Sequence, residues 1–212
     1  MTQKELREIL EKHLNYIDGT NFDDRAIIQG EDLTGLDFQP FCLQGIVFMN
    51  CDLSGVNLSD KVLKFSIFDG SNFSGANFQG ADLTLSRFNY AKFSNSDLIS
   101  ANLSGSNLCR AILIKSDLSN ANFTNTDLQD ANLQEANLTN ACFHNANLYC
   151  ANLSDAIIKN ADFSNANLSV VDMSNLDFTL ASNTDGMKYD ILMKHGVQML
   201  NLGSLLLFDI VI

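Results

Sequence analysis

Large apolar side chains recur at every fifth residue through most of the chain. From Leu33 to Phe178, all thirty of these positions are Leu or Phe except Ile158 and Met173. The residue two places before each of them is small through the middle of the chain, as at Ala101, and Asn or Asp commonly stands between the two. A period of five fits neither the period of about 3.6 of a helix nor the period of about 2 of a strand. It predicts a coil in which each unit forms one side and one corner, with the small and the large residue pointing inward.

The individual units share one pattern: a small residue, Asn or Asp, Leu or Phe, and two further residues. Residues 121–125 read Ala-Asn-Phe-Thr-Asn, and residues 151–155 read Ala-Asn-Leu-Ser-Asp. Over residues 31–180, in unbroken phase, the chain resembles the pentapeptide-repeat family. The resemblance implies an all-β fold, a right-handed quadrilateral β-helix with four units per coil. Thirty units then form about 7.5 coils, a rod about 36 Å long at about 4.8 Å per coil, with no projecting loop.

Four units per coil place each residue over the one twenty positions later, so the sequence can be read in columns. Phe123, Phe143 and Phe163 share an inward column, where ring stacking is favourable. The outward columns are expected to hold two Asn ladders and two exposed ion pairs: Asn120–Asn140–Asn160, Asn125–Asn145–Asn165, Arg110–Asp130 and Lys115–Glu135. No two of the five cysteines are twenty positions apart, and only Cys51 points inward, so free thiols are expected.

The ends of the repeat predict three segments. Residues 1–19 are expected to form a capping helix, because Thr2 and Glu5 can make a capping box ahead of an apolar stripe. Residues 20–180 are expected to form the β-helix, and residues 181–212 a C-terminal helix and an apolar tail. The tail is expected either to cap the last coil or to pair with its copy in a homodimer, through Leu205, Leu206, Leu207, Phe208, Ile210, Val211 and Ile212.

One unit departs most from the repeat and marks the candidate contact site. In residues 61–65, Lys61 takes an inward position, while Val62 and Phe65 point outward. Apolar neighbours in adjacent coils extend this into an expected exposed patch, of the kind that marks protein contacts, formed by Val47, Met49, Val62, Phe65, Ile67 and Leu85. The alternative is a local bulge that turns Lys61 outward.

Composition narrows the functional classes. The net charge of −12 argues against direct binding of nucleic acid. The sequence shows no secretion signal and no run of 18 apolar residues, which predicts a bacterial cytoplasmic protein without membrane contact; a secreted effector remains an alternative. The three histidines are scattered, no metal-ligand spacing is present, and no nucleophile stands beside a base. No enzyme activity and no cofactor are therefore expected.

Two functions remain. The first is a protein–protein interaction scaffold or regulator whose protein partner is unknown. The second follows from the resemblance, because some family members act as DNA mimics that bind DNA gyrase and protect it from quinolones. Sixteen acids against seven bases in residues 31–180 give −9, which suits a mimic. The acids are spread over several columns, however, and the projecting loops of many gyrase-protecting relatives are absent, so the scaffold is favoured.

Overall fold

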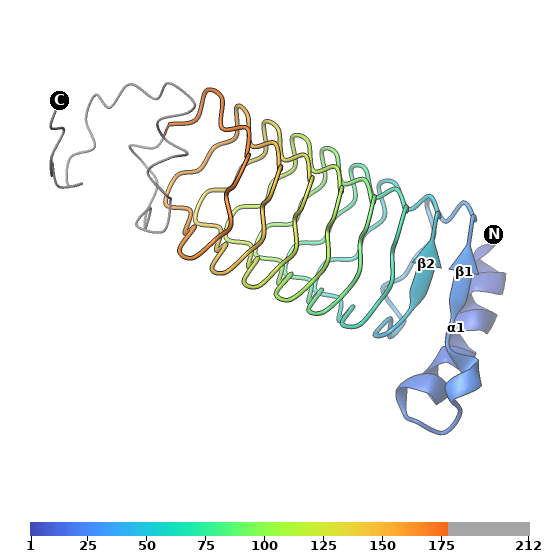
Figure 1. Ribbon diagram of the computed structural model, residues 1–212. Coiled ribbons are helices and arrows are strands. Elements are labelled where there is room, and N and C mark those ends of the chain that lie inside the picture. Colours follow the sequence, from blue (N-terminus) through green and yellow to red (C-terminus); the bar gives the residue numbers. More distant parts are fainter. Residues whose placement is uncertain (178–212) are drawn as a thin grey trace, which may run out of the picture.

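A helix at one end and a long stack of coils make up the described part of the chain, residues 1–177 of this computed structural model (Figure 1). The named elements are helix α1 at Gln3–Ile17, the short 3₁₀ helix η1 at Phe22–Asp24, strand β1 at Ile27–Gln29 and strand β2 at Val47–Met49. Helix α1 lies against the first coil, and the stack extends away from it. The coils, rather than a flat sheet, therefore carry the fold.

Neighbouring coils are joined by parallel pairing between residues twenty positions apart. Strands β1 and β2 pair in this way, with Ile28 opposite Phe48. Beyond β2, each side of a coil is so short that a single residue makes the bridge, from Asp52–Asn72 to Asn152–Asp172. The twenty-residue spacing predicted from the columns is thus present through the described coils.

The backbone hydrogen bonds explain why Asn or Asp stands in the middle of each unit, as residues 71–75 show. The N–H groups of Phe73 and Gly75 donate to the following coil, at 2.6 and 3.0 Å, and that of Asn72 to the preceding coil, at 2.9 Å. The Ser74 N–H instead donates to the side-chain oxygen of Asn72, at 3.1 Å. The Asx side chain therefore satisfies a turn N–H group that would otherwise lack an acceptor.

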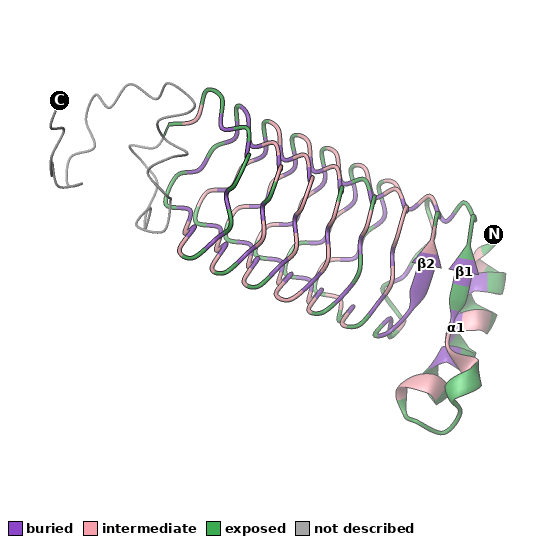
Figure 2. Ribbon diagram, in the orientation of Figure 1, coloured by how far each residue is buried: buried purple, intermediate pink, exposed green. Residues whose placement is uncertain are grey.

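The inward side chains form a continuous core along the stack, and buried positions alternate with more exposed ones around each coil (Figure 2). The rings of Phe123, Phe143 and Phe163 stack at centroid distances of 4.8 and 4.9 Å, as predicted. Phe48 and Phe68 share a column too, but their rings meet at 61° and 6.0 Å. The repeat thus fixes which rings share a column, whereas local packing sets their angle.

The predicted outward columns are also present. Asn140 donates to Asn120 at 3.0 Å and Asn160 to Asn140 at 3.1 Å. The other predicted contacts of this kind are Asn145 to Asn125 at 3.2 Å, Arg110 with Asp130 at 3.3 Å and Lys115 with Glu135 at 3.4 Å. All five cysteines are free, and only Cys51 is buried.

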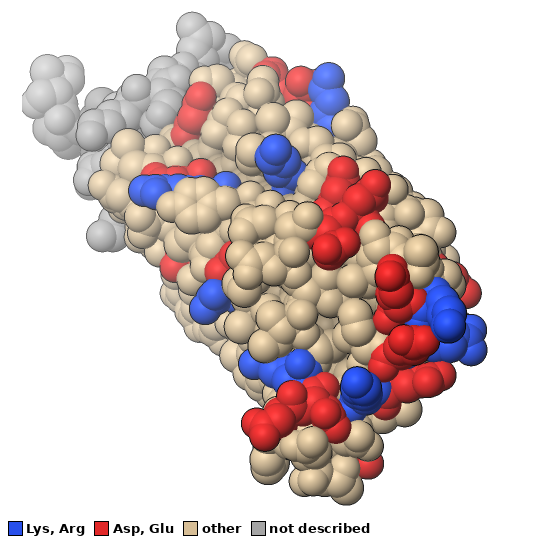
Figure 3. Space-filling view, turned by 90° about the vertical axis from the view of Figure 1, so that its right-hand side faces the viewer, with Lys and Arg blue, Asp and Glu red and all other residues tan. Residues whose placement is uncertain are grey.

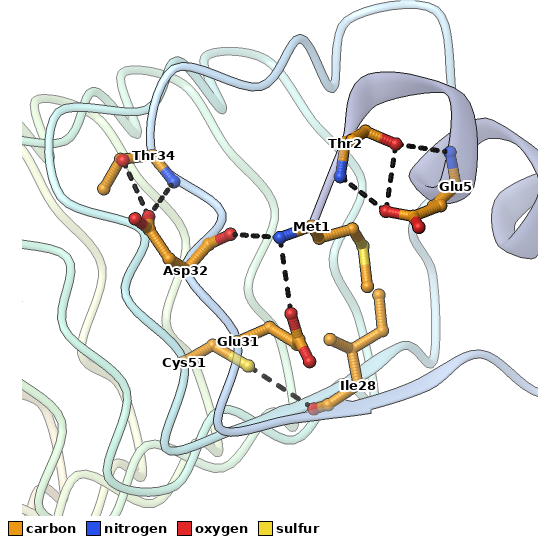
Figure 4. Close-up of polar contacts among 8 residues, drawn as sticks. All are labelled: Met1, Thr2, Glu5, Ile28, Glu31, Asp32, Thr34 and Cys51. Carbon is orange, nitrogen blue, oxygen red and sulfur yellow. Dashed lines mark hydrogen bonds and ion pairs between the residues drawn. The ribbon is translucent and has the colours of Figure 1, made fainter.

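Helix α1 begins with a capping box and covers the first coil with its apolar side. The Glu5 N–H donates to the Thr2 hydroxyl at 3.3 Å, and the Thr2 N–H donates to the Glu5 carboxylate at 2.7 Å (Figure 4). This pairing lowers the pKa of the Glu5 carboxyl. Leu6 and Leu10 are 0 % and 1 % exposed. In the same close-up, the Met1 amino nitrogen lies 3.4 Å from the carboxylate of Glu31 at the coil edge.

Polar side chains of α1 also form hydrogen bonds with the backbone edge of the first coil, the edge with which a preceding coil would pair. The side-chain amide of Gln3 donates to the Asp37 carbonyl at 2.9 Å and accepts from the Asp37 N–H at 2.7 Å. His13 is fully buried, and its Nδ1 accepts from the Ala26 N–H at 3.1 Å. Its Nε2 therefore carries the proton and donates to the Gln44 carbonyl at 3.1 Å. An edge bonded in this way cannot recruit another strand.

Acidification is expected to destabilise the docked helix through His13. Burial, with a contribution from the Arg25 charge, lowers the pKa of His13 below its ordinary value of 6.5, although the bond to Gln44 opposes this. The unfolded chain therefore takes up this proton first, and stability is lost as the pH falls below about 6.5. In urea unfolding at about pH 7.5 and about pH 5.5, the wild type should lose more free energy of unfolding than His13→Gln. Equal losses in the two proteins would contradict this.

Candidate interaction surface

An exposed apolar surface lies where residues 61–65 and the coil that follows depart from the repeat. Val62, Phe65 and Leu85 are 47 %, 52 % and 54 % exposed, and Ile67 beside them is partly buried. These four residues are called the Phe65 surface below. Two further residues that the sequence predicted as contacts lie differently. Val47 is buried within β2, only 4 % exposed, so it offers no surface to a partner, and Met49 is partly buried.

At two positions of this surface the backbone adopts the left-handed conformation, which glycine adopts most easily. Phe65 and Leu85 have φ of 59° and 56°, in the left-handed region. The same corner carries Gly45 in the coil before and Gly105 in the coil after. A residue with a Cβ costs roughly 1–2 kcal/mol in this conformation. The repeat places this left-handed backbone at nearly every fifth residue, but it does not require a large exposed apolar side chain there, as two adjacent coils have at Phe65 and Leu85.

Arg25 joins the Phe65 surface to the N-terminal helices. Its Nε donates to the Gly45 carbonyl at 2.6 Å and its Nη2 to the Phe65 carbonyl at 3.4 Å. Its guanidinium lies 5.5 Å from the ring centre of Tyr16, whose ring meets the exposed Phe22 edge-on at 6.4 Å. The repeat pattern does not reveal this group, because its members come together only when α1 docks on the first coil.

Two ion pairs border the Phe65 surface. Lys64 lies 2.9 Å from Asp82, and Arg87 lies 2.6 Å from Asp69. On the face shown in Figure 3, acidic and basic side chains lie interspersed, with wide uncharged areas between them. These pairs are partly exposed and screened by solvent, so each contributes little to the stability of the fold.

Lys61 marks a local irregularity rather than a buried charge. Its ammonium group donates to the backbone carbonyls of Gln39 and of Phe41, the latter at 3.1 Å. Bridges are present at Asp32–Asp52 and Val62–Asp82, but among the described residues none joins residues 42 and 62. The Lys61 amine thus bonds carbonyls in a stretch where the pairing between coils is interrupted.

One outward column of the rod contains several aspartates and, among the described residues, no Lys or Arg. Asp97 bridges Asp117, and Asn77 and Asn137 continue the column on either side. Asp37 begins the same column in the first coil, and none of its members among the described residues is Lys or Arg. The acids near the Phe65 surface, by contrast, face bases directly.

The remaining reactive groups are held in structural contacts. Burial and the neighbouring Asp127 raise the pKa of Cys109 to about 11, so this side chain is a neutral thiol at pH 7. His144 Nδ1 lies 2.8 Å from Ser164 Oγ, a bond between turn residues of successive coils. Within residues 1–177 no three His, Cys, Asp or Glu side chains are grouped to hold a metal ion. No helix in the same range is long and apolar enough to cross a membrane.

The predicted cap or dimer contact of the tail falls outside the described residues. This applies to all of its members: Leu205, Leu206, Leu207, Phe208, Ile210, Val211 and Ile212.

Comparison with known proteins gives a family and several similar structures. The family described as pentapeptide repeats matches in eight copies, over residues 46–84, 76–114, 91–130, 116–149 and 146–182. No curated protein matches the sequence.

Among solved structures, QnrB1, a plasmid-mediated fluoroquinolone resistance protein, is 22 % identical over 80 % of this chain and 95 % of that one, with a TM-score of 0.45. Rfr23 from the cyanobacterium Cyanothece 51142 is 28 % identical over 61 % and 88 %, with a TM-score of 0.36. HetL from Nostoc sp. strain PCC 7120 is 22 % identical over 82 % and 96 %, with a TM-score of 0.30.

Proposed function

We propose that this chain, which belongs to the pentapeptide-repeat family, is a non-enzymatic scaffold or regulator that binds a protein partner on the side of its rod. One observation carries the proposal: Phe65 and Leu85 are half exposed and occupy a glycine-type backbone conformation in successive coils. Elsewhere at this corner position the chain commonly uses Gly or Asn, as at Gly45 and Asn125. The backbone conformation recurs at most corners, so the distinguishing feature is the exposed apolar area of two stacked side chains, which is typical of a binding site.

The finer architecture is part of the same proposal. Known structures of the family are right-handed quadrilateral β-helices, and a helix of this kind with about 7.5 coils over residues 31–180 agrees with the twenty-residue bridges. We propose residues 1–19 as the cap, residues 20–180 as the rod and residues 181–212 as a cap of the far end or a homodimer contact. The location proposed is the bacterial cytoplasm, with a secreted effector as the alternative.

A pull-down with a matched pair of variants tests the scaffold. Phe65→Asn with Leu85→Asn removes the exposed apolar area and places in the turns a residue that tolerates their backbone. Ile157→Asn is the control, because Ile157 is 55 % exposed in a distant column that carries Asn137 one coil earlier. The double variant should lose a partner that the wild type and the control both retain. The same partners in all three samples would remove the Phe65 surface from consideration.

The DNA-mimic alternative has one observation in its favour, the acidic column through Asp97 and Asp117. A mimic that binds DNA gyrase should alter supercoiling, or its inhibition by a quinolone, at micromolar concentrations of the purified chain. Asp97→Asn with Asp117→Asn should then weaken the effect, since it removes charge while retaining the Asx contacts. A supercoiling assay without inhibition and without protection would eliminate this alternative.

A further inference from the structure

Several basic side chains lie around the Phe65 surface, although the whole chain has an excess of acids and a net charge of −12. Three cations stand around Phe65: Arg25 donates to its carbonyl, Lys64 precedes it, and Arg87 bridges Ile67 on the next coil. Two of them are matched, because Lys64 and Arg87 each pair with one aspartate, at 2.9 and 2.6 Å. The third cation, Arg25, belongs to none of the ion pairs found in residues 1–177.

Arg25 has no ion pair within residues 1–177, although acidic residues are close in sequence. The carboxylate of Asp24 accepts a hydrogen bond from the Asn15 side chain of α1, at 2.8 Å. The contacts of Arg25 with Gly45 and Phe65 use two of the five N–H donors that a guanidinium carries. The Tyr16 ring, 5.5 Å from the guanidinium carbon, adds a cation–π contact, so these three contacts together restrict the directions of the remaining donors.

We propose that the protein segment that docks on the Phe65 surface presents large apolar side chains next to an Asp or Glu, whose carboxylate pairs with Arg25. This rests on the proposed scaffold function and names the chemistry of its partner. The apolar side chains would cover Phe65, Leu85 and Ile67 and supply most of the free energy through buried area. The carboxylate would set the direction and register of the segment, because a guanidinium binds it through two parallel hydrogen bonds.

The charge of the rest of the rod makes this preference selective. An acidic segment is repelled by most of a chain with net charge −12 and is accepted only where a cation lacks a partner. A basic segment would be attracted to the rod in general, but at Phe65 it would meet Arg25 with like charge.

A selection from a phage-displayed library of random peptides tests the inference without knowledge of the natural partner. Peptides are selected on the wild-type chain after depletion on the Phe65→Asn, Leu85→Asn double variant. The selected peptides should combine aromatic or large aliphatic residues with Asp or Glu. Enrichment of Lys or Arg, no enrichment of acidic residues, or the absence of peptides that require Phe65 and Leu85 would each overturn the inference.

Arg25 variants provide the second readout, with the best selected peptide as the probe. Arg25→Gln should weaken its binding about tenfold or more and make the remaining affinity less sensitive to salt. Arg25→Lys should bind more weakly than the wild type but keep the wild-type salt dependence, because an ammonium group keeps the charge and cannot make the two parallel hydrogen bonds. Equal affinity and equal salt dependence in Arg25→Gln and the wild type would overturn the pairing. If the pull-down still depends on Phe65 and Leu85 in that case, the scaffold stands and only the proposed partner chemistry fails.

Discussion

Phe73→Ala is expected to lower the free energy of unfolding by about 3–5 kcal/mol. The Phe73 ring is fully buried and contacts four other rings, with centroid distances between 5.1 and 6.2 Å. Coils stacked on both sides fix its surroundings, so the vacated space can close only in part, and the loss includes a cavity term as well as the lost burial.

Urea unfolding followed by circular dichroism measures this loss, and Phe22→Ala is the control. Phe22 is 74 % exposed, so its removal should change the free energy of unfolding by less than about 1 kcal/mol. Similar losses for the two variants would show that the inward column does not dominate stability.

Leu10→Asp is expected to detach α1 from the first coil. Leu10 is 1 % exposed, and a carboxylate there would be buried without a partner. The free energy of unfolding should fall at least as much as in a large-to-small core substitution, which costs about 2–5 kcal/mol. Release of the helix also withdraws Gln3 and His13 from the backbone edge of the first coil. An uncovered edge invites pairing with another chain, so the variant should form larger species as its concentration rises.

Size-exclusion chromatography over a range of concentrations, with helix content from circular dichroism, follows this change. Leu14→Asp is the matched control, because Leu14 lies on the same helix and is 47 % exposed. The control should behave like the wild type. An unchanged elution profile and helix content in Leu10→Asp would mean that α1 does not protect the edge.

The five-residue period was sufficient to predict the regular part of the rod. It placed Phe123 next to Phe143 and Asn120 next to Asn140 in successive coils, because each unit repeats the same hydrogen bonds and the spacing between coils follows from them. It also predicted that Cys51 alone among the cysteines is buried. These features depend on local geometry repeated many times, which a sequence pattern records directly.

The candidate surface was predicted only in part, because it depends on contacts that occur once. The period marked Phe65 and Leu85 as departures but wrongly placed Val47 with them on an exposed patch, since Val47 lies between its bridge partners Ile27 and Ile67 and is only 4 % exposed. Arg25 and Tyr16 reach the surface through the docking of α1, and no repeated pattern encodes that docking.

The free energy of unfolding of the Phe65→Asn, Leu85→Asn double variant tests most directly whether the Phe65 surface serves binding instead of folding. Relief of the left-handed backbone, about 1 kcal/mol at each position, should offset the loss of two half-exposed side chains. The predicted result is a value within about 1 kcal/mol of the wild type. A loss of about 3 kcal/mol or more, comparable to that of Phe73→Ala, would contradict this by placing Phe65 and Leu85 among the residues that hold the rod together.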